Sequence, residues 1–248
     1  MLRAVGVTDK GRVRPTNEDC FAVREDLGLC VIADGMGGHN AGEVASRLAV
    51  DAVVESCAVV SDGWPFGYDD TLSAAGNLLR TAIHRANVSI LETAITSDTY
   101  TGMGTTLVAA HVTGGHLVVA HAGDSRLYVF ADGQLRQVTR DDSWMATVLA
   151  NDPAADPTVL MNHPMRNALT NVVGAGTRTD VHVVEQPVAS GDLLLLTTDG
   201  VHGVMDEGQL KRLMVGDENL DAIAANVIAA ALARGSRDNC TAIVARVA

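Results

Sequence analysis

The chain has 248 residues, of which 47% are hydrophobic and 19% are charged. This length and composition predict one layered domain with a large core and exclude a disordered chain. Aromatic residues make up only 3%, so the core has to be built from Ala, Val, Leu and Ile, and few rings are available to stack on single-stranded nucleic acid.

The net charge is −12, from 30 acidic and 18 basic residues, which argues against a nucleic-acid or anionic-membrane partner. Ordinary solubility is one explanation for such an acidic chain, and a group of carboxylates that hold cations is the other. The four cysteines form no C-x-x-C pair and are expected to be reduced, no apolar run reaches the ~20 residues of a membrane span, and no secretory signal is recognisable. A cytoplasmic location is therefore expected.

The first hundred residues change from a strand pattern to a helical one. Short apolar segments separated by turn residues predict strands at 2–8, 20–25 and 28–33. Apolar residues at a spacing of three to four then predict helices at 40–60 and 70–95.

Most of the remaining chain follows a hairpin pattern. Turn dipeptides separate predicted strands at 105–112, 116–122, 126–131 and 134–138. A helical stretch at 140–152 and an irregular, proline-containing segment at 153–167 come next. The last predicted elements are strands at 181–186, 192–198 and 240–247 and helices near 206–215 and 217–234. Antiparallel sheet with helices outside is favoured, and no linker divides the chain.

Two acidic residues end apolar strands and are each followed by glycine. Asp34 closes the run from Leu29 and precedes a glycine-rich turn, and Asp199 closes the run from Leu193. A carboxylate at the end of a core strand is costly to desolvate unless a positive group meets it. Asp-Gly is also a common turn dipeptide, as at Asp132-Gly133, so local pattern alone leaves both interpretations open.

Further acidic residues lie at strand ends or corners, at Glu18-Asp19, Asp124 and Asp238. If stacked sheets bring these ends to one edge, the oxygens suit Mg²⁺ or Mn²⁺, and two such ions can activate a water and neutralise a phosphoryl group. No Cys/His cluster suggests zinc instead.

The ordered set of motifs resembles the metal-dependent protein phosphatases of PP2C type, most of all the compact bacterial Ser/Thr phosphatases. The matching segments span residues 14–241 and are Arg14-x-x-Asn17-Glu18-Asp19, Asp34-Gly35-Met36-Gly37-Gly38-His39, Gly104-Thr105-Thr106, Gly123-Asp124-Ser125-Arg126, Thr198-Asp199-Gly200 and Asp238-Asn239-Cys240-Thr241.

This resemblance implies an α+β fold, a four-layer α-β-β-α sandwich of two antiparallel sheets flanked by helices, with metals at one edge. Residues 1–248 are expected to form a single domain with a flap at about 142–170. Two Mn²⁺ or Mg²⁺ ions are implied, with a third in some bacterial members. The implied metal ligands are Asp34, Gly35 through its carbonyl, Asp199, Asp238, Asp19 and Glu18 through water, and Asp124 for the third ion.

The resemblance also implies two catalytic residues. Arg14 matches a phosphate-binding arginine whose planar fork holds two phosphoryl oxygens, although a solvated loop charge is the alternative. His39 matches a general acid for the leaving alkoxide, and a histidine with a structural hydrogen bond is the alternative. The implied reaction is direct attack of a metal-activated water on phosphorus.

Two positions depart from the family pattern. Similar proteins often carry Asp-His-Ser where this chain has Asp141-Asp142-Ser143, and Leu-Thr-Arg where Asn171 follows Leu169-Thr170. Both positions lie near the expected flap, so they concern substrate docking rather than metal chemistry.

The leading hypothesis is a Mn²⁺/Mg²⁺-dependent phosphatase acting on phosphoserine and phosphothreonine in proteins and opposing a Ser/Thr kinase. Phosphorylated proteins, including such a kinase or its substrates, are the expected partners, and a monomer is expected. A catalytically dead phosphoprotein-binding module would have lost acids such as Asp34 or Asp199, which are present. A small-molecule phosphomonoesterase is a third hypothesis, which a comparison of p-nitrophenyl phosphate with phosphopeptides would separate.

Overall fold

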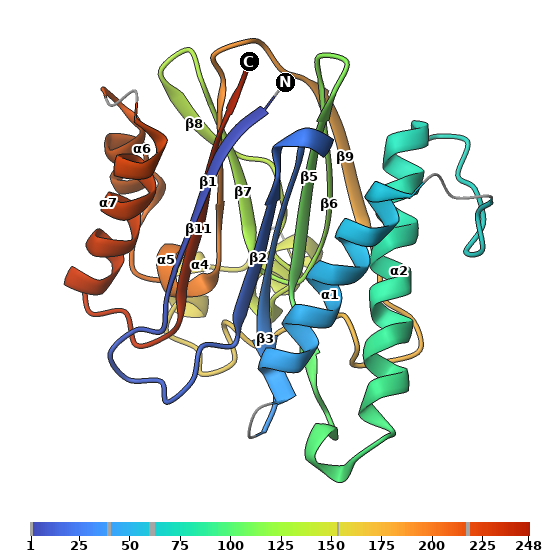
Figure 1. Cartoon of the computed structure of the whole chain (residues 1–248). Coiled ribbons are helices and arrows are strands. Elements are labelled where there is room, and N and C mark those ends of the chain that lie inside the picture. The colour runs from blue at the N-terminus through green and yellow to red at the C-terminus, as the bar shows by residue number, and fades with distance from the viewer. Residues whose placement is uncertain (1, 39–40, 60–62, 153, 217–218) are drawn as a thin grey trace.

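Two antiparallel sheets lie face to face with helices on both outer sides in the computed structural model, which describes residues 2–38, 41–59, 63–152, 154–216 and 219–248 (Figure 1). The first sheet has the order β1-β11-β10-β7-β8, and the second has the order β2-β3-β5-β6-β9 with β4 paired to β3. The predicted α-β-β-α sandwich is therefore confirmed.

The strands of both sheets follow the predicted hairpin pattern closely. The first sheet contains β1 (Leu2–Asp9), β7 (Arg126–Ala131), β8 (Gln134–Gln137), β10 (Leu193–Thr197) and β11 (Cys240–Val247). The second contains β2 (Asp19–Arg24), β3 (Leu29–Met36), β4 (Gly104–Thr105), β5 (Leu107–Thr113), β6 (His116–Ala122) and β9 (His182–Pro187).

Helices cover the outer face of each sheet. The second sheet is covered by α1 (Ala41–Ala58) and α2 (Ala74–Ala94), and the first by α6 (Glu207–Met214) and α7 (Leu220–Ala233) (Figure 1). Shorter helices are α3 (Trp144–Asn151), α4 (Pro157–Leu160) and α5 (Asp199–His202), with 3-10 turns at Glu25–Leu27 and Asp98–Tyr100. Among the described residues no helix is long and apolar enough to cross a bilayer.

One local expectation was wrong. The segment 153–167 is not wholly irregular, because Asp156 caps α4 with its side chain and Pro157 stands at the first helical position, where its missing N–H is not needed. At Asp199, where the local pattern left a plain turn as one of two interpretations, the chain begins α5, so the carboxylate lies at a helix N-terminus, where a negative charge is favoured.

The interior consists of aliphatic residues in three layers. One cluster fills the space between the sheets, and one lies between each sheet and its helices. Ala, Val, Leu and Ile dominate all three, as the low aromatic content predicts. This rigid core fixes the strand ends from which the acidic residues project.

Leu194 lies between the sheets with no exposed surface, so Leu194→Ala should lower the free energy of unfolding by about 2–5 kcal/mol through lost contacts and a cavity. Ile95 is 86% exposed and serves as the control, since Ile95→Ala should change it by no more than about 0.5 kcal/mol. Chemical denaturation measures both. Equal effects would contradict the described core.

Candidate metal centre

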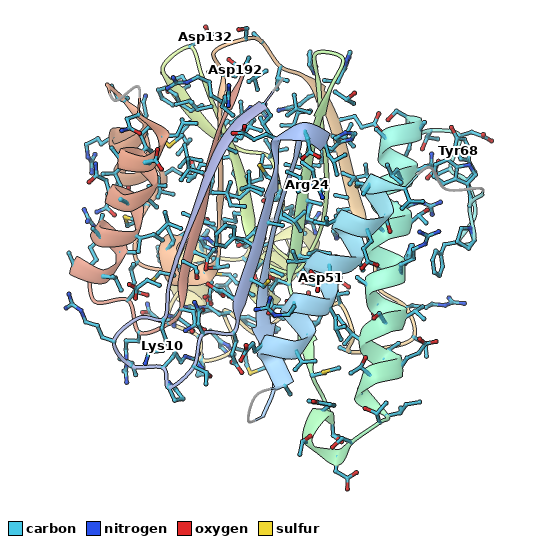
Figure 2. All side chains as sticks on the ribbon, in the orientation of Figure 1. Lys10, Arg24, Asp51, Tyr68, Asp132 and Asp192 are labelled. Atoms are coloured by element: carbon cyan, nitrogen blue, oxygen red, sulfur yellow. The ribbon has the colours of Figure 1, made fainter. Side chains whose placement is uncertain are left out.

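The acidic residues that end separate strands line one cavity of about 360 Å³. From the predicted set, its lining includes Arg14, Glu18, Asp34, Gly35, Asp124, Asp199 and Asp238. The loop that carries Lys10 lies at this end of the molecule, and Asp132 and Asp192 are labelled at the opposite end (Figure 2). Asp34 and Asp199 thus line the cavity, whereas the Asp132-Gly133 turn lies far from it.

Asp34 lies at the centre of a group of buried carboxyl groups. It is paired across strands with Asp19, and burial raises its pKa well above the usual value, with further increases from Asp19, Asp199 and Asp124. Burial likewise raises the pKa of Asp19 to about 7 and that of Asp124 to about 7. Like charges this close disfavour ionisation of all of them unless a cation is present.

Asp19 is held in place by two threonine hydroxyls. Thr198 and Thr241 both donate to its Oδ2, at 2.9 Å and 2.5 Å, while its buried Oδ1 has no hydrogen-bond partner among the described residues. Sequence reasoning did not assign these threonines a role. The available signal was their position inside the Thr198-Asp199-Gly200 and Cys240-Thr241 motifs.

Asp199 is buried beside Asp34 at the start of α5. Burial raises its pKa, Asp238 raises it further, and a hydrogen bond shared with Asp34 works in the opposite direction. Its buried Oδ1 also lacks a hydrogen-bond partner within the described ranges. Two carboxyl groups at hydrogen-bonding distance need a proton or a cation between them.

The glycines that follow both strand-end acids are required by close backbone approach. A Cβ on Gly35 would lie 2.0 Å from the Gly42 carbonyl oxygen, and one on Gly200 would lie 1.9 Å from the Asn239 carbonyl oxygen. At Gly133 a Cβ would meet nothing within 4 Å. Glycine after aspartate is therefore needed at the cavity because the backbone segments pack closely there, which is not the case in the Asp132-Gly133 turn.

The threonines of the Gly104-Thr105-Thr106 motif fix the backbone of Asp34. The Thr106 hydroxyl accepts from the Asp34 N–H at 3.1 Å, and the Asp34 carbonyl accepts from the Thr105 hydroxyl at 2.9 Å and from the Thr106 N–H at 2.9 Å. Thr106 also shares a 2.7 Å hydroxyl hydrogen bond with Ser125, next to Asp124. The hydroxyl groups of Thr105, Thr106 and Ser125 thus support the neighbouring acids.

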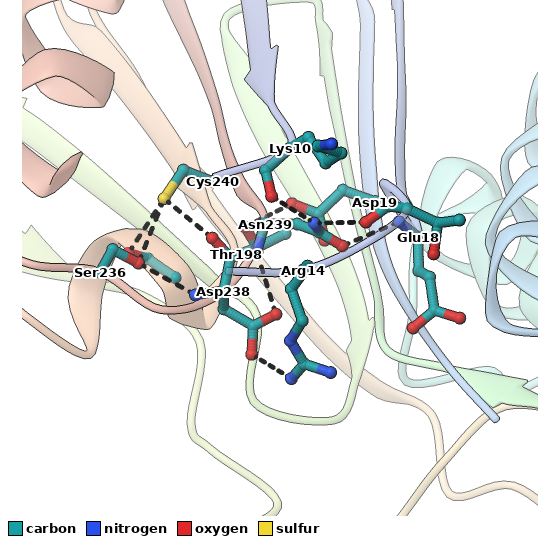
Figure 3. A network of polar contacts seen from close by, with 11 residues as sticks. Lys10, Arg14, Glu18, Asp19, Thr198, Ser236, Asp238, Asn239 and Cys240 are labelled. Carbon is teal, nitrogen blue, oxygen red and sulfur yellow. Dashed lines mark hydrogen bonds and ion pairs between the residues drawn. The ribbon is translucent and has the colours of Figure 1, made fainter. Parts of the chain in front are cut away.

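Arg14 and Asp238 form an ion pair at the rim of the cavity (Figure 3). The distance from Arg14 Nη2 to Asp238 Oδ2 is 2.6 Å, and the Arg14 side chain is 48% exposed. Asn239 anchors the surrounding loop, because its amide donates to the Lys10 and Thr16 carbonyls and its oxygen accepts from the Glu18 N–H. Asn239 is a second supporting residue that the sequence analysis did not single out.

The remaining predicted residues have different outcomes. Glu18 lines the cavity, where burial raises the pKa of its carboxyl and the Gly42 N–H of α1 hydrogen-bonds to it. His39 lies outside the described residues, so its role stays a prediction. The segment expected to form a flap contributes Asn167 and Leu169 to the lining, and Val172 follows just beyond it.

A hard divalent cation fits this set of donors. The buried, unpartnered oxygens of Asp19 and Asp199 and the raised pKa values of four neighbouring carboxyl groups indicate that the chain itself supplies too little positive charge to keep these groups ionised. Oxygen-only donors suit Mg²⁺ or Mn²⁺. Within the described part of the chain, no three acidic, histidine or cysteine side chains already converge on one point, so binding would require some of these carboxylates to rotate.

Comparisons with known proteins agree with this architecture. The family model described as protein phosphatase 2C matches residues 12–234. The chain is 33% identical over 243 residues to the serine/threonine phosphatase stp of Listeria monocytogenes, covering 96% of this chain and 92% of that one. The crystal structure of the Mycobacterium tuberculosis serine/threonine phosphatase PstP/Ppp superposes with a TM-score of 0.87 at 31% identity, covering 99% and 98% of the two chains.

A further structure, the catalytic domain of the serine/threonine phosphatase PstP in complex with two manganese ions, is also similar. Its TM-score is 0.83 at 30% identity, covering all of this chain and 99% of that one.

Removal of one carboxylate should separate metal binding from folding. Asp199→Asn relieves repulsion among the acids, so in chelator its melting temperature should equal or exceed that of the unchanged protein. Mn²⁺ should raise the melting temperature of the variant by less than it raises that of the unchanged protein. Thermal melting with and without Mn²⁺ measures both effects. Asp70→Asn, at an exposed position, is the control. A lower melting temperature in chelator together with an undiminished gain from Mn²⁺ would remove Asp199 from the site.

Proposed function

We propose, because this chain belongs to the protein phosphatase 2C family, that it hydrolyses phosphoserine and phosphothreonine in proteins and thereby opposes a Ser/Thr kinase. Membership of the family makes it a metal-dependent phosphoric monoester hydrolase that uses Mn²⁺ or Mg²⁺. The observation that supports the proposal best is the convergence of acids from separate strands on one cavity with Arg14 at its rim.

Each residue of the cavity has a proposed part in this reaction. Asp34, the Gly35 carbonyl, Asp199 and Asp238 would hold two cations, with Asp19 and Glu18 acting through bound water. Such a pair of ions lowers the pKa of water and neutralises phosphoryl charge. Asp124 faces Asp199 closely enough to raise its own pKa further, which supports a third cation between these two residues.

Arg14 would bind the phosphoryl group of the substrate. Its ion pair with Asp238 uses one N–H of a guanidinium that has five, so the fork keeps donors for phosphoryl oxygens. The ion pair also holds the guanidinium beside Asp238, one of the acids that line the cavity (Figure 3). Arg14 therefore brings the phosphorus and the acidic cluster together.

Other parts of the proposal follow from the sequence. His39 would protonate the leaving serine or threonine oxygen, a role that its ordinary titration range permits. We also propose a cytoplasmic monomer consisting of one domain with a flap at 142–170. A phosphoprotein-binding module without activity is disfavoured because Asp34, Asp199 and Asp238 all line the cavity.

The function is tested by hydrolysis of a phosphothreonine peptide and of p-nitrophenyl phosphate, with Mn²⁺ and with chelator. We expect turnover of both substrates only with metal, a higher kcat/KM for the peptide, and a loss of at least about 100-fold in Asp34→Asn, because the charge stabilisation depends on this carboxylate. Asp70→Asn should behave like the unchanged protein. Undiminished activity in chelator would refute the metal-dependent reaction, and a preference for p-nitrophenyl phosphate would favour a small-molecule phosphomonoesterase.

Arg14→Ala should raise KM about tenfold or more while Mn²⁺ binding, followed by calorimetry, persists, because the arginine contacts phosphate through charge-assisted hydrogen bonds. Arg14→Lys should recover only part of the loss, since an ammonium cannot form the bidentate fork. Arg12→Ala, on the same loop at an exposed position, is the control. Equal effects at Arg12 and Arg14 would indicate a general loop charge instead.

A further inference from the structure

Asp142 joins three segments of the chain through its side chain. Its Oδ2 accepts from the Gly123 N–H at 3.0 Å and from the Asn171 amide at 2.7 Å, and its Oδ1 is 2.9 Å from His182 Nε2. The side chain is only 13% exposed. These contacts link the corner between β6 and β7, the end of the flap and the start of β9.

The backbone of Asp142 reinforces the same connection. Its N–H donates to the Gly123 carbonyl at 3.0 Å, and its carbonyl accepts from the Thr170 N–H at 2.8 Å. Gly123 has φ 98° and directly precedes Asp124, which lines the cavity. The position of the Asp124 corner is thus set partly from the root of the flap.

Asn171 fixes the other side of this connection. Its amide also donates to the Asp180 carbonyl at 2.7 Å, and its oxygen accepts from the Asp180 N–H at 3.2 Å. Leu169 and Val172, on either side of it along the chain, both line the cavity. A change at Asn171 therefore reaches the cavity wall formed by the flap.

The ring of His182 packs against the ring of His121. The two ring centroids are 5.0 Å apart, and His121 is 1% exposed. His121 therefore packs against one face of the His182 ring, and the Nε2 edge of that ring is directed at Asp142. Because a carboxylate only accepts, Nε2 of His182 is the donor in this contact. The network contains no lysine or arginine among its described members, and its carboxylate is satisfied by three side-chain or backbone donors.

We infer that Asp142 is a positioning residue that joins the Asp124 corner to the segment that follows the flap, with Asn171 as its matched partner. The inference rests on the proposed function. Asp142 and Asn171 contact each other directly through a 2.7 Å hydrogen bond, so the two residues act as one unit. Through this pair, the metal side and the substrate side of the cavity share one support.

The test is a double-mutant cycle of Asp142→Ala, Asn171→Ala and both together. Asp142→Ala should raise about tenfold both the Mn²⁺ concentration for half-maximal activity and the KM for a phosphothreonine peptide, because it releases Gly123 and the flap. Asn171→Ala should raise the peptide KM and leave the Mn²⁺ requirement unchanged. The double variant should resemble Asp142→Ala. Additive effects on KM, or a fall in kcat alone, would overturn the inference.

Hydrogen exchange of the metal-free protein supplies a readout independent of activity. The amides of Gly123 and Thr170 should exchange at least about tenfold faster in Asp142→Ala, because their acceptor is lost or displaced. Asp156→Ala, which removes the α4 cap within the same flap, is the control and should leave these two amides unchanged. Unchanged exchange in Asp142→Ala would overturn the inference even if activity falls. If Asp142→Ala does not fold, Asn171→Ala still tests the pair through faster exchange at Thr170.

If the unchanged protein has no phosphatase activity, the proposed function fails, and the exchange experiment still decides whether Asp142 connects the two segments.

Discussion

Mutual repulsion among buried carboxyl groups is the constraint on which this site depends. Asp19 is buried, Asp34, Asp124 and Asp199 are half-buried, and each of the four has a pKa raised first by burial. A protein gains no stability from gathering acids in this way, so the arrangement is expected only where a ligand repays it. Divalent cations are such ligands, because each cancels two negative charges and is bound by the oxygens that lack hydrogen-bond partners.

The rest of the fold holds these acids in place against that repulsion. The cross-strand pair of Asp19 and Asp34 is fixed by the register of β2 and β3, and hydroxyl groups of Thr198, Thr241 and Thr106 hold the side chain of the first and the backbone of the second. The aliphatic core between the sheets keeps the strand ends rigid. Neutral hydroxyls suit this task, because a lysine or arginine in the same place would compete with the cations.

Hairpin turns and apolar runs are local signals, so the sequence predicted most strands and helices, whereas the layered arrangement and the acids of the cavity were predicted from the resemblance of the ordered motifs to a known family. The sequence could not predict contacts between distant segments. The hydroxyl contacts of Thr241 with Asp19, the anchoring role of Asn239 and the pairing of Asp142 with Asn171 all join residues far apart along the chain. The short helices α4 and α5 were missed because each is a single turn of four residues, too short to show an apolar period.

Asp142 and Asn171 illustrate how a departure from a family pattern can be physically consistent. Considered singly, each residue is the loss of a side chain that similar proteins often carry, because an acid or an amide stands in its place. Together they form a 2.7 Å hydrogen bond, and His182 and Gly123 satisfy the remaining acceptor positions of the carboxylate. A buried polar group is costly when unpaired and inexpensive when fully paired, so such positions are expected to change jointly rather than one at a time.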